Sequence, residues 1–451
     1  MRIVSSGAET RKNKYPAPPM MKFDSDSIRS AFPALSITDN GKRRIYLDNP
    51  AGTQVPAMVV ERMSECLIEA NANLGGYFVT AGKADMVMHE AHSAMADLLN
   101  APSADDVIFG QNMTTMTLHV SRSIGRTFSP GDEIILTRMD HDANVTPWVL
   151  LARDLDLKIK WLPFNLETFE FELENLENLI SDKTKLICVG GASNLTGTIH
   201  DIKSICAIAK AAGVWTYIDA VQSVPHVSTD VQDLDCDFLA CSAYKFFGPH
   251  QGILYGRRDV MQQLEPYKVR PAPDQMPGAY ETGTQSHEGA AGVWATVEYF
   301  ANIGKEMAQD YHERNQHLDG RSRDLHAAMD YLFDFEAGLA EHLIKGLQQM
   351  PGVRIQGISD PSAMRRRVPT VSFTVEGDSP DRIARALGAE NIFVWSGHNY
   401  ALEAANALGI LESGGVIRVG PVHYNTMDEL DEFLVSLQAI LKLQFAAVRG
   451  L

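Results

Sequence analysis

Two side chains that could do chemistry stand at the ends of two apolar runs near the middle of the chain. The first run begins at Val214 and ends at Asp219, and the second ends at Cys241 and is followed by Ser242 and Lys245. Functional groups of α/β proteins collect at the carboxyl ends of strands. Pyridoxal 5'-phosphate (PLP) needs a lysine for its Schiff base and an acid for its pyridinium nitrogen, and a hydroxyl can serve its phosphate. Taken singly, Asp219 could cap a turn and Lys245 could be a solvated surface residue. The arrangement of the residues is what predicts a PLP site.

The segment around Asn112, Met113 and Thr114 lies between an expected strand and an expected helix. Helix N-termini offer unpaired N–H groups and the positive end of a dipole, so this turn could bind the cofactor phosphate. Such turns occur in every α/β protein. The turn gains meaning here because a PLP enzyme needs a phosphate site on the same sheet.

Three further polar residues accompany expected strands. His141 follows the strand expected at 132–137 and could stack on a planar cofactor or move protons, although a solvent-facing loop histidine is the alternative. Asn194 ends another strand and could donate to a ring hydroxyl, or it could simply form a turn. Arg418 lies inside an apolar strand, where a half-buried guanidinium needs an anion. A substrate carboxylate and an internal salt bridge are both possible partners.

Strand-like and helix-like segments alternate over the part of the chain that carries most of these residues. This pattern is typical of βαβ units stacked around a mostly parallel sheet, hence of an α/β fold. The expected strands are 106–109, 132–137, 158–163, 184–190, 214–219, 236–241 and 253–256, and the expected helices are 114–125, 145–155, 172–180 and 201–212.

The pattern changes after about residue 292. A long helical region runs to Met350, and short strands expected at 370–376, 391–395 and 416–420 then alternate with helices. In the last helix Thr426 and Glu429 have the spacing of a capping box. The apolar residues that follow it form one stripe, which we interpret as core: Leu430, Phe433, Leu434, Leu437, Ile440 and Leu441.

Composition restricts the possible partners. The chain of 451 residues has a formal net charge of −17, which argues against nucleic acid and anionic membranes as partners. The five cysteines show no disulfide-like or metal-binding spacing, so a reducing, cytoplasmic setting is expected and no metal site is indicated. We expect neither a secretory signal nor a membrane span.

Several of these segments together resemble the class V aminotransferase family, in particular its cysteine-desulfurase-like group. The resemblance extends from Tyr46 to the last helix. It is carried by YLDNPAGTQVP (46–56), MDHDANVTPW (139–148), SNLTGT (193–198), DAVQSVPH (219–226), DLDCDFLACSAYKFFGP (233–249), YETGT (280–284) and IRVGPVHYNT (417–426). It implies the PLP-dependent transferase fold of type I, with a seven-stranded, mostly parallel large domain and a smaller α+β C-terminal domain. The first segment is more similar to a little-characterised branch of the group than to the desulfurases themselves.

The resemblance also implies roles and boundaries. It implies an N-terminal arm at 1–40 that packs with the small domain, a PLP-binding large domain at 41–290 and a small domain at 291–451. A homodimer with shared active sites is implied as well. The implied site residues are Lys245 for the Schiff base, Asp219 on the pyridinium nitrogen, Gln222 and Asn194 near the ring oxygen, His141 stacked on the ring, Ser242 and the turn at 112–114 on the phosphate, Arg418 on the substrate carboxylate, and Thr284 from the partner subunit.

The chain departs from the family pattern at the position that matters most for desulfuration. The segment that should carry the mobile cysteine reads Ser396-Gly397-His398-Asn399-Tyr400, and no cysteine follows Cys241. A phenol cannot form a persulfide, so Tyr400 and His398 are expected to bind substrate instead. Tyr244 replaces the histidine usually found before the lysine, and its phenol could still donate to phosphate. His287 and Glu288 could shape substrate choice or be solvated loop charges.

These features predict a PLP-dependent enzyme that acts on a small amino acid through Cα deprotonation. Transamination, racemisation and β-elimination all remain open, so the enzyme could be an aminotransferase or a C–S or β-lyase. One alternative is desulfurase activity with an external or different thiol as acceptor. Another is a PLP-binding protein with a regulatory role and no turnover.

Overall fold

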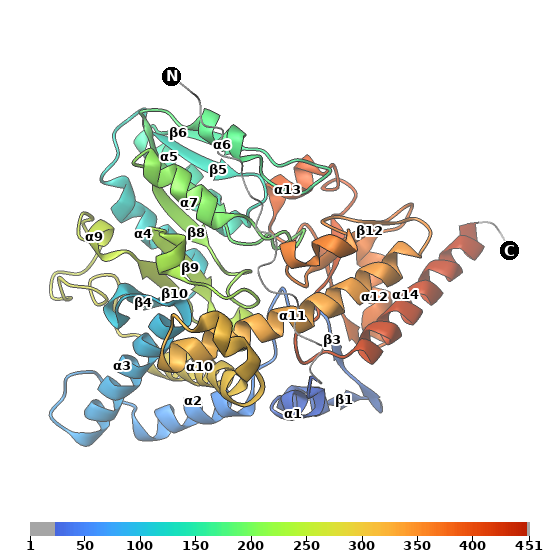
Figure 1. Ribbon diagram of the computed structural model, residues 1–451, viewed down its shortest axis with the longest axis horizontal. Coiled ribbons are helices and arrows are strands. Elements are labelled where there is room, and N and C mark those ends of the chain that lie inside the picture. The colour runs from blue at the N-terminus through green and yellow to red at the C-terminus, as the bar shows by residue number, and fades with distance from the viewer. Residues whose placement is uncertain (1–22, 449–451) are drawn as a thin grey trace.

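A seven-stranded sheet forms the centre of the larger part of the molecule (Figure 1). The computed structural model describes residues 23–448, with side chains up to residue 442. The strand order is β4-β10-β9-β8-β7-β5-β6, and only β10 runs antiparallel to its neighbours. The strands are β4 (Val107–Gly110), β5 (Glu133–Thr137), β6 (Lys158–Leu162), β7 (Thr184–Gly190), β8 (Trp215–Asp219), β9 (Phe238–Ser242) and β10 (Gly252–Gly256). The predicted α/β class and mostly parallel sheet are confirmed.

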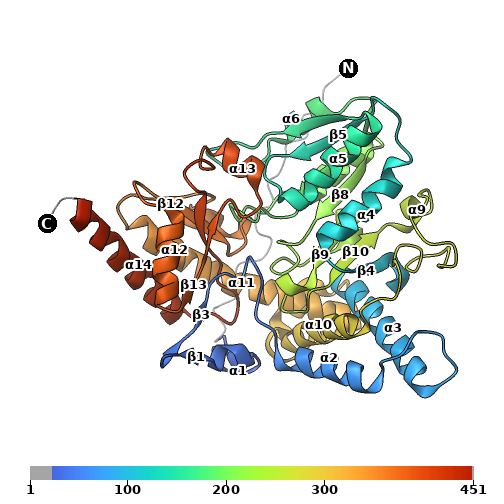
Figure 2. The same ribbon diagram turned by 180° about the vertical axis from the view of Figure 1, so that it is seen from behind.

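Both faces of this sheet are covered by helices, which explains why its central strands are rich in buried apolar residues. Along β7, Leu186 and Cys188 belong to one core cluster and Ile187 and Val189 to another, with the period of two that a strand imposes. α4 (Met113–Gly125) and α5 (Thr146–Leu155) cover the first face, as Figure 2 shows. α7 (Ile202–Ala211), α3 (Val79–Leu99) and α10 (His287–Met307) contribute to the core on the second face.

A second sheet, of four antiparallel strands, lies in the C-terminal part of the chain. Its order is β11 (Val353–Ile355), β12 (Val371–Val375), β15 (Val416–Val419) and β14 (Trp395–Gly397). Three helices pack with it: α11 (Gly320–Gln348), α12 (Pro380–Ala389) and α14 (Met427–Val448). The predicted capping box is confirmed, because Thr426 Oγ1 accepts from Glu429 N at 3.2 Å and Glu429 Oε2 accepts from Thr426 N at 3.3 Å. The apolar stripe of α14 is core, as predicted.

The single strand expected at 391–395 is two strands. β13 (Ile392–Phe393) pairs in parallel with β3 (Ile45–Tyr46), whereas β14 pairs with β15 in the other sheet. The chain therefore changes partner at Val394, which the run of apolar residues could not reveal. α10 packs on α2 (Ala57–Glu69) and α3. It begins close to residue 290, where the sequence predicts the boundary between the large and the small domain, and that domain boundary stays a prediction.

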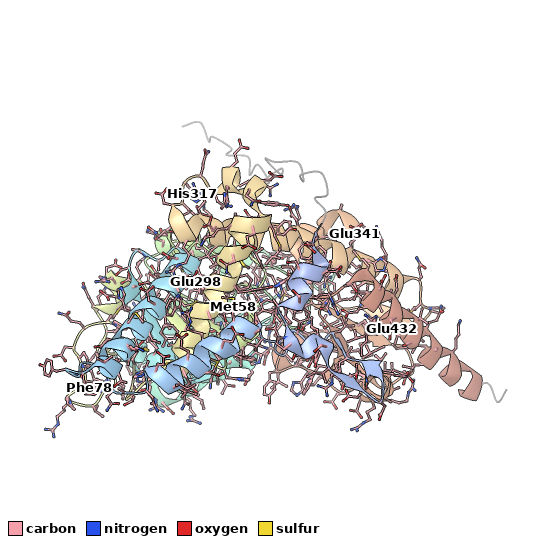
Figure 3. The ribbon with its side chains drawn as sticks, turned by 90° about the horizontal axis from the view of Figure 1, so that it is seen from below. Met58, Phe78, Glu298, His317, Glu341 and Glu432 are labelled. Atoms are coloured by element: carbon pink, nitrogen blue, oxygen red, sulfur yellow. The ribbon has the colours of Figure 1, made fainter. Side chains whose placement is uncertain are left out.

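The N-terminal segment joins the two parts. α1 (Ser25–Ser30) is held by an ion pair between Arg29 and the buried Glu429 of α14, and residues 1–22 of the expected arm lie outside the described part. Seen from below in Figure 3, Phe78 lies near one end of the molecule and Glu432, on α14, lies toward the other, with Met58 on α2 between them. Among residues 23–448, no helix is long and apolar enough to cross a membrane.

The long helix α11 also connects the two parts through a buried carboxylate. Glu336 Oε2 lies 2.7 Å from His226 Nδ1, and Glu336 Oε1 accepts from His423 N at 3.0 Å. His226 follows the turn that carries Gln222, and His423 follows the strand that carries Arg418. This contact therefore fixes the two expected binding regions relative to each other.

Candidate active site

A cavity of about 480 Å³ lies where β5, β7, β8 and β9 end at their carboxyl sides. Ten of the residues predicted from the sequence line it: Asn112, Met113, Thr114, His141, Asn194, Asp219, Gln222, Ser242, Tyr244 and Lys245. Asp140 and His250 also line it and were not predicted. The arrangement follows from the parallel strands, which bring segments distant in sequence to one edge of the sheet.

Lys245 lies inside this cavity, in the short turn Ala243–Lys245 that follows β9. Its Nζ donates to the carbonyl oxygens of Pro50 and Ala51, at 2.5 and 3.1 Å. Burial and the nearby Arg418 guanidinium lower the pKa of Lys245 to about 7, although Asp219 and Asp48 act in the opposite direction. A lysine in this state has a substantial neutral fraction near neutral pH, as a nucleophile or base requires.

Asp219 ends β8 and is 6% exposed. Its Oδ1 accepts from the backbone N–H of Val221 at 2.9 Å. Burial raises the pKa of Asp219 to about 6, and the Val221 N–H and the Lys245 charge limit the rise. A carboxylate in this place can favour a protonated, cationic ring nitrogen.

The start of α4 offers an anion site at one side of the cavity. Asn112 caps the helix, with Oδ1 accepting from Thr115 N at 2.9 Å, and Met113 N donates to Ser242 Oγ at 3.0 Å. The Ser242 hydroxyl accepts this bond and keeps its own hydrogen for another acceptor. Together with Thr114, these groups suit a phosphate.

His141 is held as a neutral imidazole. Its Nδ1 accepts from Ala143 N at 3.0 Å, so Nε2 carries the ring proton. Burial, Lys245 and Arg418 lower the pKa of His141 to about 3. The ring stacks on Tyr400 with centroids 5.4 Å apart and an angle of 19° between the planes.

Asn194 and Gln222 present oxygen atoms rather than donors. Asn194 Nδ2 donates to Asn399 O at 2.7 Å and Gln222 Nε2 donates to Thr370 Oγ1 at 3.1 Å. Asn194 Oδ1 and Gln222 Oε1 are buried and have no partner. The sequence suggested that Asn194 donates to a ring hydroxyl, whereas its geometry suits accepting a hydrogen bond from that hydroxyl.

Arg418 is fully buried, at 4% exposed, rather than half-buried as expected. Its Nη1 donates to Asn194 O at 3.0 Å, Nε has no partner, and no ion pair with a carboxylate is formed among the described residues. Burial lowers the pKa of Arg418 to about 10, with Asp48 and Tyr244 opposing. The internal salt bridge considered from the sequence is therefore absent, and the guanidinium keeps donors for an anionic ligand.

Tyr400 and His398 lie on a loop from the small sheet that reaches the large one. Asp142 N donates to Tyr400 O at 2.7 Å, and Asn399 and Tyr400 adopt φ of 51° and 58°. His398 Nδ1 accepts from Tyr400 N at 3.0 Å. The Tyr400 side chain is 67% exposed, so the loop places a phenol beside His141 at the edge of the site.

Thr284 does not line the Lys245 cavity. It is exposed and lines a neighbouring cavity of about 530 Å³, which shares His250 with the first. His287 is buried at the start of α10, with Nε2 unpartnered, and Glu288 Oε1 accepts from Ser286 Oγ at 2.7 Å. Neither is a fully solvated loop charge.

The donor set of the cavity fits PLP. The helix start can bind phosphate, Asp219 can pair with a ring nitrogen, two orphaned amide oxygens can meet a ring hydroxyl, and Lys245 supplies the amine. Asp140, Asp48 and His250 were not predicted because in the sequence each of them looks like an ordinary turn residue. The cavity places Asp140 and His250 at the site, and the charge of Asp48 acts on Lys245.

The lowered pKa of Lys245 predicts how cofactor capture depends on pH. Only the neutral amine attacks the cofactor aldehyde, so the capture rate should rise as pH increases through about 7 and then level off. Stopped-flow absorbance after mixing cofactor-free protein with PLP, over a pH series on both sides of 7, measures this rate. A rise only near 10.5, the value of an ordinary lysine, would contradict the effect of burial.

Comparison with known proteins adds independent information. The family model described as Aminotransferase class-V matches residues 45–322 and 324–433. The chain is 32% identical over 428 residues to an aminotransferase-like protein of Gibberella zeae, covering 93% of this chain and 99% of that protein. It is 30% identical over 438 residues to a cysteine desulfurase of Serratia proteamaculans, covering 94% and 100%.

Solved structures agree. The apo structure of a cysteine desulfurase from Thermococcus onnurineus superposes with a TM-score of 0.82 at 27% identity, covering 94% of this chain and 99% of that one. An Escherichia coli cysteine desulfurase superposes with a TM-score of 0.77 at 25% identity, covering 94% and 100%. The resemblance noted from the sequence motifs is confirmed, and so is the fold that it implied.

Proposed function

The chain belongs to the class V aminotransferase family of PLP-dependent enzymes, and from this premise we propose that it removes the Cα proton of a small amino acid without forming a persulfide. The observation that supports this most is that Lys245 and Asp219 line one cavity beside Arg418. Arg418 donates to the backbone of Asn194 and forms no ion pair with a carboxylate among the described residues, and position 400 carries a tyrosine. The family assignment alone does not separate transfer, elimination and desulfuration.

Bound PLP supplies an electron sink for the charge that develops at Cα. The Arg418 guanidinium binds the substrate carboxylate through the N–H groups that do not donate to Asn194. Asp219 holds the ring nitrogen in its protonated form. His141, as a neutral imidazole in the cavity lining, would contact the ring without adding charge.

Lys245 is the base in this proposal. Its ammonium form is disfavoured by burial, so the amine released by substrate can take the Cα proton near neutral pH. The carbonyl oxygens of Pro50 and Ala51 accept hydrogen bonds from Nζ at the cavity wall. They can accept these hydrogen bonds again after Nζ has taken the Cα proton. These contacts orient the amine for both roles.

The cysteines of the chain do not offer a persulfide acceptor. All five are buried, and burial raises the pKa of every one of their thiols. A thiol in this state is a poor nucleophile, since the thiolate is the reactive form. None of them lies on the loop of Tyr400.

We therefore expect no protein-bound persulfide after incubation with L-cysteine. Intact-mass spectrometry of the protein should show no added sulfur, with or without a reductant. Tyr400→Cys places a thiol on the exposed loop beside His141, and this variant should gain the added sulfur. A persulfide on the unmodified protein would overturn this part of the proposal.

Product analysis on a panel of small amino acids tests the proposed reaction. Conversion of the bound cofactor to its pyridoxamine form, restored by a 2-oxo acid, identifies an aminotransferase. Release of pyruvate or sulfide with the cofactor unchanged identifies a lyase, and sulfide release only with an added thiol acceptor identifies the desulfurase alternative. If no amino acid alters the cofactor absorbance, the non-catalytic alternative replaces the proposal.

A homodimer with shared sites is part of the proposal. Thr284 is exposed beside the cavity rather than within it, so in a dimer it would be free to face the partner's site. Light scattering after size-exclusion chromatography gives the oligomeric state. Activity recovered on mixing Lys245→Ala and Thr284→Ala subunits would show that sites are shared, and no recovery would contradict it.

A further inference from the structure

Asp140 is a buried carboxyl group that the chemistry described above does not use. It follows β5, is 3% exposed, and lines the same cavity as Asp219. It directly precedes His141 in the chain. A carboxyl group is costly to bury without partners, so its contacts indicate what it is for.

Both oxygens of Asp140 accept hydrogen bonds. Oδ1 accepts from Gly190 N at 2.8 Å, and Oδ2 accepts from Asn144 Nδ2 at 2.9 Å. Trp148 Nε1 donates to Asn144 Oδ1 at 3.1 Å. An indole N–H can only donate, so the Asn144 amide must turn its nitrogen toward Asp140. The surroundings are therefore built for an acceptor at both oxygens of residue 140.

Asp140 follows β5 and Asp219 ends β8, the two strands that flank β7 in the sheet. Gly190, which donates to Asp140, is the register partner of Asp219 between β7 and β8. A Cβ atom on Gly190 would lie 2.9 Å from Asp140 Oδ1, so the carboxyl group rests against this glycine. Burial, and then the negative charge of Asp219, raise the pKa of Asp140 to about 8.

The other titratable groups around Asp140 carry little charge. Burial keeps the Cys188 thiol protonated by raising its pKa, and keeps His200, which contacts Gly190 O, neutral by lowering its pKa to about 4. His141 is neutral as well. Among the described residues of this cavity, the charge that acts on Asp140 is that of Asp219.

We propose that Asp140 is a second carboxyl group of the site that binds the cofactor ring. It acts through Asp219 to stabilise the proton that Asp219 and the ring nitrogen share. Above a pH of about 8 Asp140 is itself ionised, and its negative charge then makes loss of that proton harder, because the loss would leave two nearby anions without a cation. Asp140 is a positioning residue in this role, since it acts through Asp219. This inference rests on the proposed PLP function.

Nitrogen NMR of protein loaded with PLP labelled at the ring nitrogen tests the proposal. The pH at which the ring nitrogen loses its proton is measured in the unmodified protein, in Asp140→Asn and in Asn144→Leu. Asp140→Asn removes the ionisable carboxyl group. Asn144→Leu removes the hydrogen bonds with Asp140 and Trp148 but keeps the Asp140 carboxyl group, and is the matched structural control.

We expect Asp140→Asn to lower this pH by roughly 1 to 2 units, the effect of one charge roughly 6 to 12 Å away at an effective dielectric near 20. Asn144→Leu should shift it far less. If Asp140→Asn does not fold, the double variant Asp140→Asn/Asn144→Asp replaces it. This variant restores the match of donor and acceptor and moves the carboxyl group from position 140 to position 144. The pH of proton loss should then drop by less than in Asp140→Asn.

Two results would overturn the inference. The first is an unchanged pH of proton loss in Asp140→Asn. The other is an equal shift of this pH in Asp140→Asn and Asn144→Leu, because equal shifts mean that both substitutions act only by disturbing the structure. Failure of the unmodified protein to bind PLP would instead overturn the proposed function. Cofactor binding by the unmodified protein is therefore measured first.

Discussion

Lys245→Ala is expected to lower turnover of any amino acid substrate by at least about 10³-fold, since it removes both the covalent attachment and the proposed base. The cofactor should still bind, because the contacts at the start of α4 and at Asp219 remain, but without the visible absorbance of the covalently held form. Absorbance spectra and product formation on the same samples measure the two effects.

The matched control is Lys203→Ala, which removes a surface lysine paired with Asp233. It should leave both the spectrum and the turnover unchanged. Partial recovery of the Lys245→Ala variant by a small added amine would show that the missing group acts as a base. Undiminished turnover in Lys245→Ala would remove Lys245 from the mechanism.

Asp219→Asn is expected to lower turnover by roughly 10³-fold while the protein stays folded. The asparagine oxygen can keep the hydrogen bond from Val221 N, so the local backbone is retained. The expected loss of turnover is electrostatic. The attraction between a carboxylate and a cation about 4 Å apart, at an effective dielectric near 20, is about 4 kcal/mol. The ring nitrogen should then lose its proton, which weakens the electron sink.

Steady-state kinetics and the ring-nitrogen NMR signal measure this prediction together. Asp235→Asn is the control, since Asp235 is a partly exposed aspartate paired with Lys210 on the surface. It should change neither readout. If Asp219→Asn kept the ring nitrogen protonated and the turnover high, another group would have to stabilise the pyridinium.

Much of the large sheet could be predicted because its strands are buried on both faces. Runs such as 184–190 and 214–219 are mostly apolar and end at turn residues, and the structure places β7 and β8 within one residue of them. The capping box of α14 was equally clear, since both of its hydrogen bonds join residues three apart. Sequence patterns therefore predict the elements whose structure depends on interactions between residues close in the chain.

Other features depend on contacts that sequence order does not show. The division of residues 391–395 between two sheets is decided by β3, nearly 350 residues earlier in the chain. The hydrogen bonds of Lys245 to Pro50 and Ala51 are similarly distant. The free oxygens of Asn194 and Gln222 depend on partners in the small-sheet region, Asn399 and Thr370.

The site residues found from the sequence are those whose chemistry is distinctive in their place. A lysine after a buried strand and an arginine within one are conspicuous, and Lys245 and Arg418 were singled out for that reason. Asp140 gives no such signal in the sequence, because an aspartate before a loop histidine looks like an ordinary turn residue. Its burial and its two donors are visible only in three dimensions.

The most direct test of the account is exchange of the Cα hydrogen with solvent. The PLP-loaded protein is incubated in deuterated water with L-alanine, L-cysteine and other small amino acids, and proton NMR follows the Cα signal. We predict loss of this signal for at least one amino acid, dependent on Lys245 and independent of every cysteine. Retention of the Cα hydrogen in all of them, with the cofactor bound, would contradict Cα deprotonation as the function of this site.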